Sequence, residues 1–338
     1  LRHKWWLGVV ALGVSLVATP VVRFVAYRLR IVDRPDDLLK PHGRPTAYLG
    51  GVAMFLGFLG GMCAYLFFMP DVGERFAQIG RAISQGSPGE LLDNVVWNLA
   101  GIVAAAFVIV LVGLLDDIKG LTPRQKVAGQ LLAAALLLAG GVGYRMAVVV
   151  FSPVGLSPPN WLLVPLSVAI SFVLVIVTCN AANLLDGLDG LCGGVTGIIA
   201  LGFLALAVWL AMWGHFPGTD EMRVALCLAM AGAVLGFLPY NVPPASIFMG
   251  DAGSMLLGFF VAAMMALFCQ EGQLRWFVAA VVSFALPILD TSLAVVRRLL
   301  TGRSIFAGDR SHLYDQLVDR GMTVKQVVVL FYALALAA

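Results

Sequence analysis

The sequence predicts an all-α, polytopic integral membrane protein, with residues 1–338 forming a single membrane-embedded domain of about ten transmembrane helices. Two features of the composition indicate this class. Hydrophobic residues make up 60% of the chain, and charged residues make up only 12%, whereas a soluble domain is about a quarter charged. The third observation is their distribution, because the apolar residues fall into long segments separated by shorter polar loops.

The apolar segments are the expected membrane-spanning helices. They lie at about residues 5–27, 49–69, 95–115, 126–143, 161–179, 191–213, 222–240, 252–269, 275–299 and 324–338. The first is longer than the core of a signal peptide and lacks a small-residue cleavage site, so we expect a spanning helix. The five cysteines form no CxxC pair, which indicates neither a disulfide framework nor a zinc site.

The positive charges predict the orientation in the membrane. One set of loops comprises residues 28–48, 116–125, 180–190, 241–251 and 300–323. With the adjoining helix ends it carries 14 Lys and Arg, against 7 for the other side. The positive-inside rule therefore places this set in the cytoplasm and both ends of the chain outside. All the clusters of polar residues that are candidates for binding or catalysis lie in this cytoplasmic set of loops.

The polar stretch from Asn180 to Gly190 follows a membrane helix directly. Asn180, Asn183 and Asp186 are spaced three apart, so they share one face of a continuing helix, and Asp189 adds a second carboxylate. Such groups at the end of a membrane helix are costly unless they meet a cation, a ligand or water. The alternative is a capped helix end with a solvated turn.

Two other loops carry carboxylates at helix ends. Asp116 and Asp117 are adjacent, and because adjacent acids repel, we expect a cation or base nearby. Lys126 lies on the following helix and is a candidate for this nearby cation. Asp251 lies at the start of another helix, which is an anion-binding end. A solvated helix end and an ordinary N-cap are the respective alternatives.

The first and fifth loops are rich in groups that bind phosphate. Lys40 and His42 lie shortly before Thr46, and Arg303, Arg310 and His312 lie in the last loop. Solvated basic loops at the cytoplasmic face are the alternative. Asp290 is an acid within an apolar segment, which makes it a functional candidate, with pairing to Arg297 or to a buried Asn as the alternative.

Together these clusters favour a membrane enzyme that acts on phosphates. Mg²⁺ prefers oxygen ligands and is often bound by one or two carboxylates plus substrate phosphates. Phosphoryl transfer needs such a cation and a cradle for phosphate. A transporter is the main alternative, and the absence of a detected repeat and the gathering of polar groups on one face argue against it.

Three motifs resemble the hallmarks of one family. DDIKG at 116–120, NAANLLDGLDGL at 180–191 and NVPPASIFMGDAGS at 241–254 are similar to those of the polyprenyl-phosphate N-acetylhexosamine-1-phosphate transferases, which are of the glycosyltransferase family 4 type. This resemblance implies transfer of a sugar-1-phosphate from a UDP-N-acetylhexosamine to undecaprenyl phosphate, with release of UMP. It also implies a bacterial inner membrane with the active site facing the cytoplasm.

The resemblance assigns roles to individual residues. Asp251 is implied to bind Mg²⁺, with Asp116 as a second candidate ligand and Mn²⁺ as an alternative ion. Asp116 and Asp117 are implied to serve the lipid phosphate. Asn183, Asp186 and Asn241 are implied to line the region that binds the diphosphate and ribose of the donor. Asp189 and Phe248 are implied to contact its uracil. With His312 as a further catalytic candidate, the remaining expected substrate-binding residues are Lys40, His42, Thr46, Lys126, Asn180, Gly187, Leu188, Asp290, Arg303 and Arg310.

The last loop departs from the family pattern. Family members often have His-x-His-His, whereas this chain has His312-Leu313-Tyr314-Asp315, and the phospho-MurNAc-pentapeptide transferase branch has three consecutive histidines. The difference favours the GlcNAc-1-phosphate branch that initiates cell-envelope glycans such as O-antigen or teichoic acid. GalNAc, QuiNAc and FucNAc remain alternative sugars. A homodimer is a candidate assembly, and no nucleic acid partner is expected.

Overall fold

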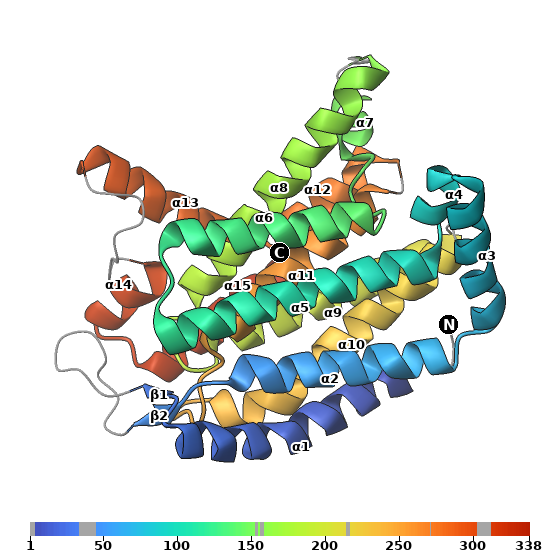
Figure 1. Cartoon of the computed structure of the whole chain (residues 1–338). Helices are drawn as coiled ribbons and strands as arrows, with labels where there is room; N and C mark the ends of the chain where they lie inside the picture. Colours follow the sequence, from blue (N-terminus) through green and yellow to red (C-terminus); the bar gives the residue numbers. More distant parts are fainter. Residues whose placement is uncertain are drawn as a thin grey trace.

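In the computed structural model the residues that the structure describes are 4–33, 45–152, 155, 159–213, 217–270, 272–302 and 312–338. These residues form helices almost throughout, together with one two-stranded sheet (Figure 1). The elements are α1 (Trp6–Leu29), β1 (Val32–Asp33), β2 (Thr46–Ala47), α2 (Gly50–Phe67), α3 (Val72–Gln85), α4 (Pro88–Leu92), α5 (Val95–Lys119), α6 (Pro123–Ala139), α7 (Met146–Phe151), α8 (Asn160–Leu185), α9 (Leu191–Trp213), α10 (Pro217–Asn241), α11 (Gly250–Cys269), α12 (Leu274–Ser283), α13 (Ala285–Leu300), α14 (Leu313–Asp319) and α15 (Val324–Ala337).

The predicted all-α polytopic class is confirmed, with fewer long spans than the ten expected. Within the described residues, seven helices are long and apolar enough to cross a membrane, or eight if the bent pair α12–α13 is one span. The segment expected at 126–143 is the 17-residue α6, and the segment expected at 324–338 is the 14-residue α15. Both are shorter than the roughly 20 residues that a perpendicular span requires.

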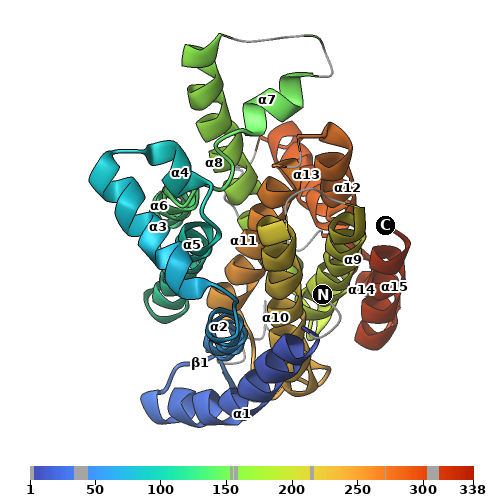
Figure 2. The same ribbon diagram turned by 90° about the vertical axis from the view of Figure 1, so that its right-hand side faces the viewer.

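Helix α11 forms the centre of the bundle. Its most apolar stretch is completely buried, and it packs against α8, α5 and α2 (Figure 2). A helix that is apolar on all sides is stable in the interior of a large bundle, which explains this position. The first turn of α11 carries Asp251, so the central helix delivers a carboxylate to one end of the bundle.

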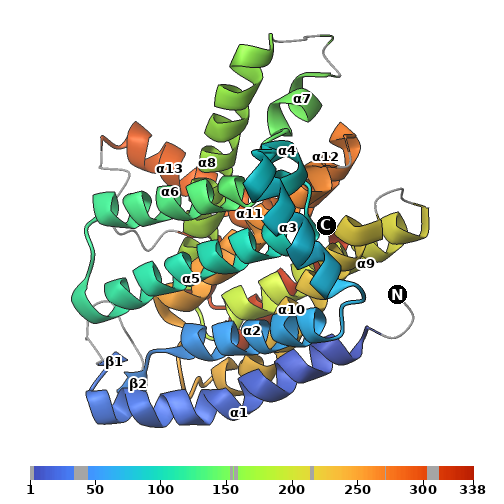
Figure 3. The same cartoon turned by 45° about the vertical axis from the view of Figure 1, so that its right-hand side comes forward.

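The segment expected as one helix at 275–299 is broken. Helices α12 and α13 meet at Phe284, where the helix axis bends by 70°. Pro287 lacks the N–H that a continuous helix would use here, which accounts for the break. Beyond it, α13 contacts α8 and then extends away from the bundle in a different direction from α8 (Figures 1 and 3), with Leu289, Leu293 and Leu300 exposed.

The loops singled out in the sequence meet at one end of the bundle. There β1 pairs with β2, and Ala47 of β2 bridges to Ile247 in the loop before α11. The end of α5, the start of α6 and α14 lie at the same end, whereas α3 and α4 lie at the opposite end (Figure 1). The polar clusters of distant parts of the sequence are therefore neighbours in space.

Candidate active site

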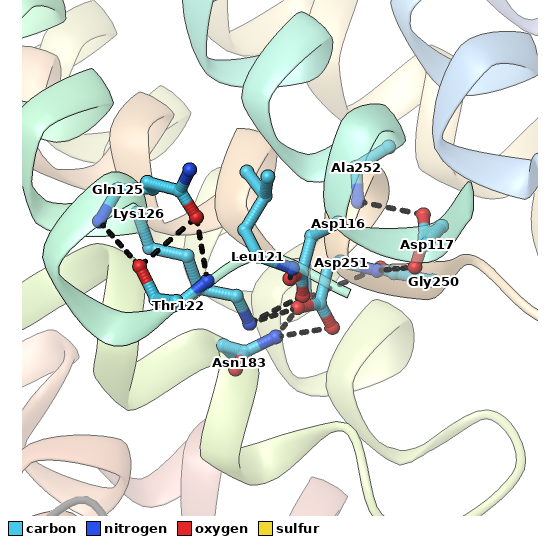
Figure 4. Close-up of polar contacts among 11 residues, drawn as sticks. Asp116, Asp117, Leu121, Thr122, Gln125, Lys126, Asn183, Gly250, Asp251 and Ala252 are labelled. Carbon is cyan, nitrogen blue, oxygen red and sulfur yellow. Dashed lines mark hydrogen bonds and ion pairs between the residues drawn. The ribbon is translucent and has the colours of Figure 1, made fainter. Parts of the chain in front are cut away.

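Four side chains from four helices form a connected cluster at this end (Figure 4). The Lys126 ammonium of α6 lies between two carboxylates, 2.5 Å from Asp116 Oδ2 of α5 and in contact with Asp251 Oδ2 of α11. Asn183 of α8 donates from Nδ2 to Asp251 Oδ1 over 2.8 Å. The predicted convergence of these loops thus exists, with a lysine held between two acids.

Local structure at the α5–α6 turn directs Lys126 into the cluster. The backbone N–H of Leu121 donates to Asp116 Oδ1 over 2.5 Å, which fixes that carboxylate at the end of α5. Thr122 and Gln125 then form a capping box that starts α6. Lys126 follows in the first turn, so it points back toward the helix that the chain has just left.

Asp117 points in a different direction from Asp116. Its two carboxylate oxygens accept the backbone N–H groups of Asp251 over 2.8 Å and of Ala252 over 3.2 Å. These are orphan donors of the first turn of α11, so Asp117 caps that helix from another helix. The carboxylate expected at the lipid phosphate is therefore directed at the helix that carries Asp251.

Small residues permit this close approach. Gly250 has φ +68°, a conformation that side chains rarely adopt, and a Cβ there would overlap the Asp117 carboxylate. On α5, a Cβ at Gly113 would overlap the backbone of Ala252. Without these glycines, α11 would lie further from α5, and Asp117 could not reach its N-terminus.

Asp186 adds a further carboxylate next to the cluster. It follows the last turn of α8, where it is half-buried and lines a cavity. Burial and the nearby charges of Asp251, Asp117 and Asp189 raise the pKa of Asp186 well above its ordinary value. Among the described residues of the cluster, Asp116, Asp117, Asp186 and Asp251 outnumber the Lys126 ammonium, so the local potential is negative and suited to a cation.

The donor set fits a magnesium ion that is shared with a substrate. Among the described residues, no group of three His, Cys, Asp or Glu side chains is arranged to hold a metal ion. Asp251 and Asp116 offer carboxylate oxygens on the two sides of Lys126. A site of this kind can bind Mg²⁺ through one or two carboxylates, with water and phosphate oxygens as the remaining ligands.

A cavity of about 890 Å³ opens beside the cluster, between α6, α8, α13 and α14. Lys126, Asn180, Asn183, Asp186 and Gly187 line its polar part, and His312 and Tyr314 line it from α14 and the residue before it. The wall formed by α8 and α13 adds apolar side chains, which are Ile176, Val177, Leu184, Ile288, Val295 and Val296. Thr291, Ser292 and Arg298 of α13 lie on the same wall. The cavity thus joins the charged cluster to a wall that carries apolar side chains.

Sequence reasoning missed Arg298 and Tyr314 as cavity residues. Arg298 is buried on α13 and lines the cavity, although the sequence analysis counted it only among the charges that set orientation. The spacing of Ile288, Thr291, Val295 and Arg298 places them on one face of α13, and this spacing could have identified the wall.

Other predicted site residues bind the backbone and shape the loops. Asp189 Oδ2 accepts the N–H of Ala245 over 2.9 Å. Asn241 is buried, and it accepts the N–H of Gly190 while donating to the carbonyl of Ile247, each over 3.1 Å. These contacts fasten the 186–190 turn to the loop before α11.

Asn180 and Leu188 differ in their surroundings. Asn180 donates from Nδ2 to Gln130 Oε1 over 3.1 Å, which links α8 to α6 next to the cavity that Asn180 lines. Leu188 packs against the hydrophobic core. Gly187 lies against Tyr314, and a Cβ at this position would overlap the phenol ring.

Phe248 and Thr46 lie around the small sheet. The Phe248 ring is 6.0 Å from the ring of Tyr48, with a tilt of 56° between the two planes. Thr46 is buried on β2, where it pairs with Asp33. The expected site residues Lys40, His42, Arg303 and Arg310 lie outside the described residues.

His312 and Asp290 form a buried pair. The His312 Nδ1 atom is 2.8 Å from Asp290 Oδ2, and each residue is only 3% exposed. Asp290 is absent from the described lining of the large cavity, which His312 reaches directly. The pairing of Asp290 with Arg297 considered in the sequence is therefore replaced by a pairing with histidine in the described structure.

Comparison with known proteins supplies the family. Residues 99–269 match the model of Glycosyl transferase family 4. The chain belongs to this family. The match covers α5 to α11 and therefore contains Asp116, Asp117, Lys126, Asn183 and Asp251, and membership favours the enzyme interpretation over the transporter alternative.

Two kinds of curated relative are similar to this family member. A Decaprenyl-phosphate N-acetylglucosaminephosphotransferase from Mycobacterium tuberculosis is 34% identical over 98% of this chain and 80% of its own length. A Probable undecaprenyl-phosphate N-acetylglucosaminyl 1-phosphate transferase from Bacillus subtilis is 29% identical over 96% and 80%. A Phospho-N-acetylmuramoyl-pentapeptide-transferase from Shouchella clausii is 33% identical over 88% and 82%. The chain is thus nearer the N-acetylglucosamine branch, as the last loop predicted.

Proposed function

We propose that the protein transfers N-acetylglucosamine-1-phosphate from UDP-N-acetylglucosamine to a polyprenyl phosphate and releases UMP. An oxygen of the lipid phosphate attacks the β-phosphorus of the donor, and the bond from that phosphorus to the bridging oxygen breaks. UMP leaves with this oxygen. The relatives named above support the sugar and the polyprenyl acceptor.

The observation that carries this proposal is the position of the charged cluster at one end of the amphipathic cavity. Lys126, Asn183 and Asp186 line its polar end, and the wall of α8 and α13 offers an apolar path for a prenyl chain. A lipid phosphate could therefore lie at the cluster while its chain contacts the apolar side chains of this wall.

Positioning and charge neutralisation are the main chemical contributions that we assign to the protein. A phosphate monoester has a second pKa of about 6, so the acceptor phosphate is already largely dianionic at neutral pH. We propose that Asp251, with Asp116 as a second ligand, holds Mg²⁺, which would neutralise charge on the donor diphosphate. Lys126 lies within reach of both carboxylates and can supply a second positive charge to a phosphate.

The direct test is UMP release by the purified protein in detergent. UMP should form only when UDP-N-acetylglucosamine, undecaprenyl phosphate and Mg²⁺ are all present, and UDP-MurNAc-pentapeptide should not replace the donor. In a panel of UDP-sugars, GalNAc, QuiNAc or FucNAc donors giving faster turnover would change the sugar while leaving the reaction class intact. No UMP release with any donor would refute the proposal.

Asp251→Asn provides a residue-level test of the metal assignment. Asparagine keeps the shape but lacks the charge that a hard cation needs, so we expect turnover to fall about a hundredfold or more. Mg²⁺-dependent binding of UDP-N-acetylglucosamine, measured by calorimetry, should be lost as well. Normal Mg²⁺-dependent donor binding by this variant would show that Asp251 does not hold the ion.

A further inference from the structure

The carboxylate of Asp290 has two donors on α14 and the residue before it. Its Oδ1 accepts the backbone N–H of Leu313 over 2.8 Å, and its Oδ2 lies 2.8 Å from His312 Nδ1. The side chain of His312 also faces the backbone N–H of Asp315, the third residue of α14, in a capping box. The 2.8 Å partner of Nδ1 is the Asp290 carboxylate, which only accepts hydrogen bonds, so the proton of this pair belongs on Nδ1. Asp290 therefore fastens the start of α14 to α13 and also fixes one ring nitrogen of His312.

The imidazole is held on a second side by Tyr314. The two rings are stacked, with centroids 5.4 Å apart and planes 6° from parallel. Tyr314 is itself fixed, because its hydroxyl donates to the carbonyl of Leu184 at the end of α8 over 3.0 Å. With Nδ1 bound to Asp290, Nε2 is the ring nitrogen left to a ligand in the cavity that His312 lines.

We propose that Asp290 is a positioning residue that holds His312 as an imidazolium, with Nε2–H donating to a phosphate oxygen of the substrate. The inference deepens the proposed function, because it requires a phosphate in the cavity. Asp290 lies on one side of the ring and phosphate on the other, and both are acceptors. A ring between two acceptors carries a proton on each nitrogen, and a charge-assisted bond to phosphate is about twice as strong as a neutral one.

Asp290→Asn changes this arrangement in a defined way. The Leu313 N–H is a fixed donor, so the asparagine oxygen should face it and the amide NH₂ should face His312. Nδ1 must then accept, and the proton moves to Nε2 as a neutral donor. Loss of an orienting carboxylate in this manner is known to disturb the tautomer in Ser-His-Asp triads. We expect kcat/KM to fall about tenfold or more.

The protonation state can be measured without turnover. Nitrogen-15 spectra of histidine-labelled protein, with the His312 signal assigned by its loss in His312→Gln, should show a protonated Nδ1 in the ligand-free wild type. In Asp290→Asn the same atom should be unprotonated. An unprotonated Nδ1 in the wild type would overturn the proposal without any variant, and an unchanged Nδ1 in Asp290→Asn would also overturn it.

A double-mutant cycle separates positioning from a purely structural role. If Asp290 acts through His312, Asp290→Asn should lower kcat/KM in the wild type but cause no further loss in His312→Gln. An equal loss in both backgrounds would overturn the proposal. Asp315→Asn is the matched control, because Asp315 accepts the backbone N–H of His312 over 3.3 Å, and this variant should leave Nδ1 protonated.

The spectra and the turnover assay can fail independently. If the wild type releases no UMP but the ring protonation follows the expected pattern, the proposed function fails while the Asp290–His312 pair remains as described. If UMP is released and Nδ1 is unprotonated, the proposed function stands and the positioning role fails.

Discussion

Asp117 and Asp116 are adjacent in the sequence but contact different parts of the protein. Asp116 faces Lys126, whereas Asp117 accepts two backbone N–H groups of α11. The resemblance assigned both acids to the lipid phosphate. In the structure Asp117 stabilises the helix end that presents Asp251, and this arrangement predicts a different effect of mutation.

Asp117→Asn should therefore lower stability and donor binding together. Asparagine offers one acceptor oxygen and turns its NH₂ toward an N–H group, so one capping bond is lost and two donors face each other. We expect a loss of about 1–2 kcal/mol in the free energy of unfolding. Thermal unfolding and calorimetry with Mg²⁺ and UDP-N-acetylglucosamine measure the two effects. Asp116→Asn leaves the α11 cap intact and is the comparison for thermal unfolding only, because Asp116 is itself a proposed Mg²⁺ ligand. Wild-type stability of Asp117→Asn would contradict the capping role.

We expect Asp186 to lower the free energy of unfolding of the ligand-free protein in a pH-dependent way. Burial and neighbouring carboxylates raise its pKa in the folded state. Below the ordinary aspartate pKa of about 4 the group is protonated in both states and has no effect. Above that value the unfolded chain ionises more readily, so the folded state loses stability as the pH rises.

Asp186→Asn should consequently raise the melting temperature of the ligand-free protein at neutral pH, and the gain should shrink toward pH 4. Melting curves in detergent across this pH range provide the measurement. A gain that is independent of pH would indicate a packing effect, and a lower melting temperature at neutral pH would contradict the expected electrostatic cost. Functional sites often carry such a cost.

At the scale of elements, the approach of α11 to α5 places the acids in one cluster. The backbone of Ala252 lies directly against Gly113, in the middle of a helix where alanine would otherwise be favoured. Glycine therefore occupies a position inside α5 where alanine would have the higher helix propensity. Its physical role is to let two helices approach at the site.

Gly113→Ala should destabilise the protein by about 1–3 kcal/mol, because the added methyl group overlaps a buried backbone. It should also reduce turnover by moving Asp251 away from Asp116. Gly202→Ala on α9 is the matched control, since a Cβ there meets no atom within 4 Å. The control should be neutral or stabilising. Equal effects of the two substitutions on melting temperature and UMP release would refute the role of close packing.

At the scale of the whole molecule, the positive charges predict that the site faces the cytoplasm. Arg124 lies at the end of the bundle that holds the charged cluster, and Ser84 of α3 lies at the opposite end; both are exposed. In intact cells, cysteine at residue 84 should react with a membrane-impermeant maleimide, whereas cysteine at residue 124 should react only after permeabilisation. The opposite labelling pattern would reverse the orientation.

Much of the architecture was predictable from the sequence because a bilayer imposes simple rules. Long apolar segments must form helices, since backbone groups cannot be left unpaired in hydrocarbon. The chemical identity of the site was also accessible, because carboxylates and cations at the ends of membrane helices are costly without a function. Asp116, Lys126, Asn183 and Asp251 were identified in this way, and the structure brings them together.

The direction of each side chain was decided only by the tertiary structure. Sequence spacing does not show that Asp117 faces a helix end, that Asn241 binds loop backbone, or that Asp290 binds His312. These contacts join segments tens to more than a hundred residues apart, or depend on a loop whose conformation has no periodicity.

Sequence alone therefore determined the fold class, the family resemblance and the chemical groups of the site. The tertiary structure decided which acid faces the cation, which acid caps a helix and which acid orients a histidine. The physical reason is that charge and apolarity are properties of single residues and local segments. The partner of a buried carboxylate depends instead on how closely separate helices pack, and at this site that closeness depends on glycines such as Gly113 and Gly250.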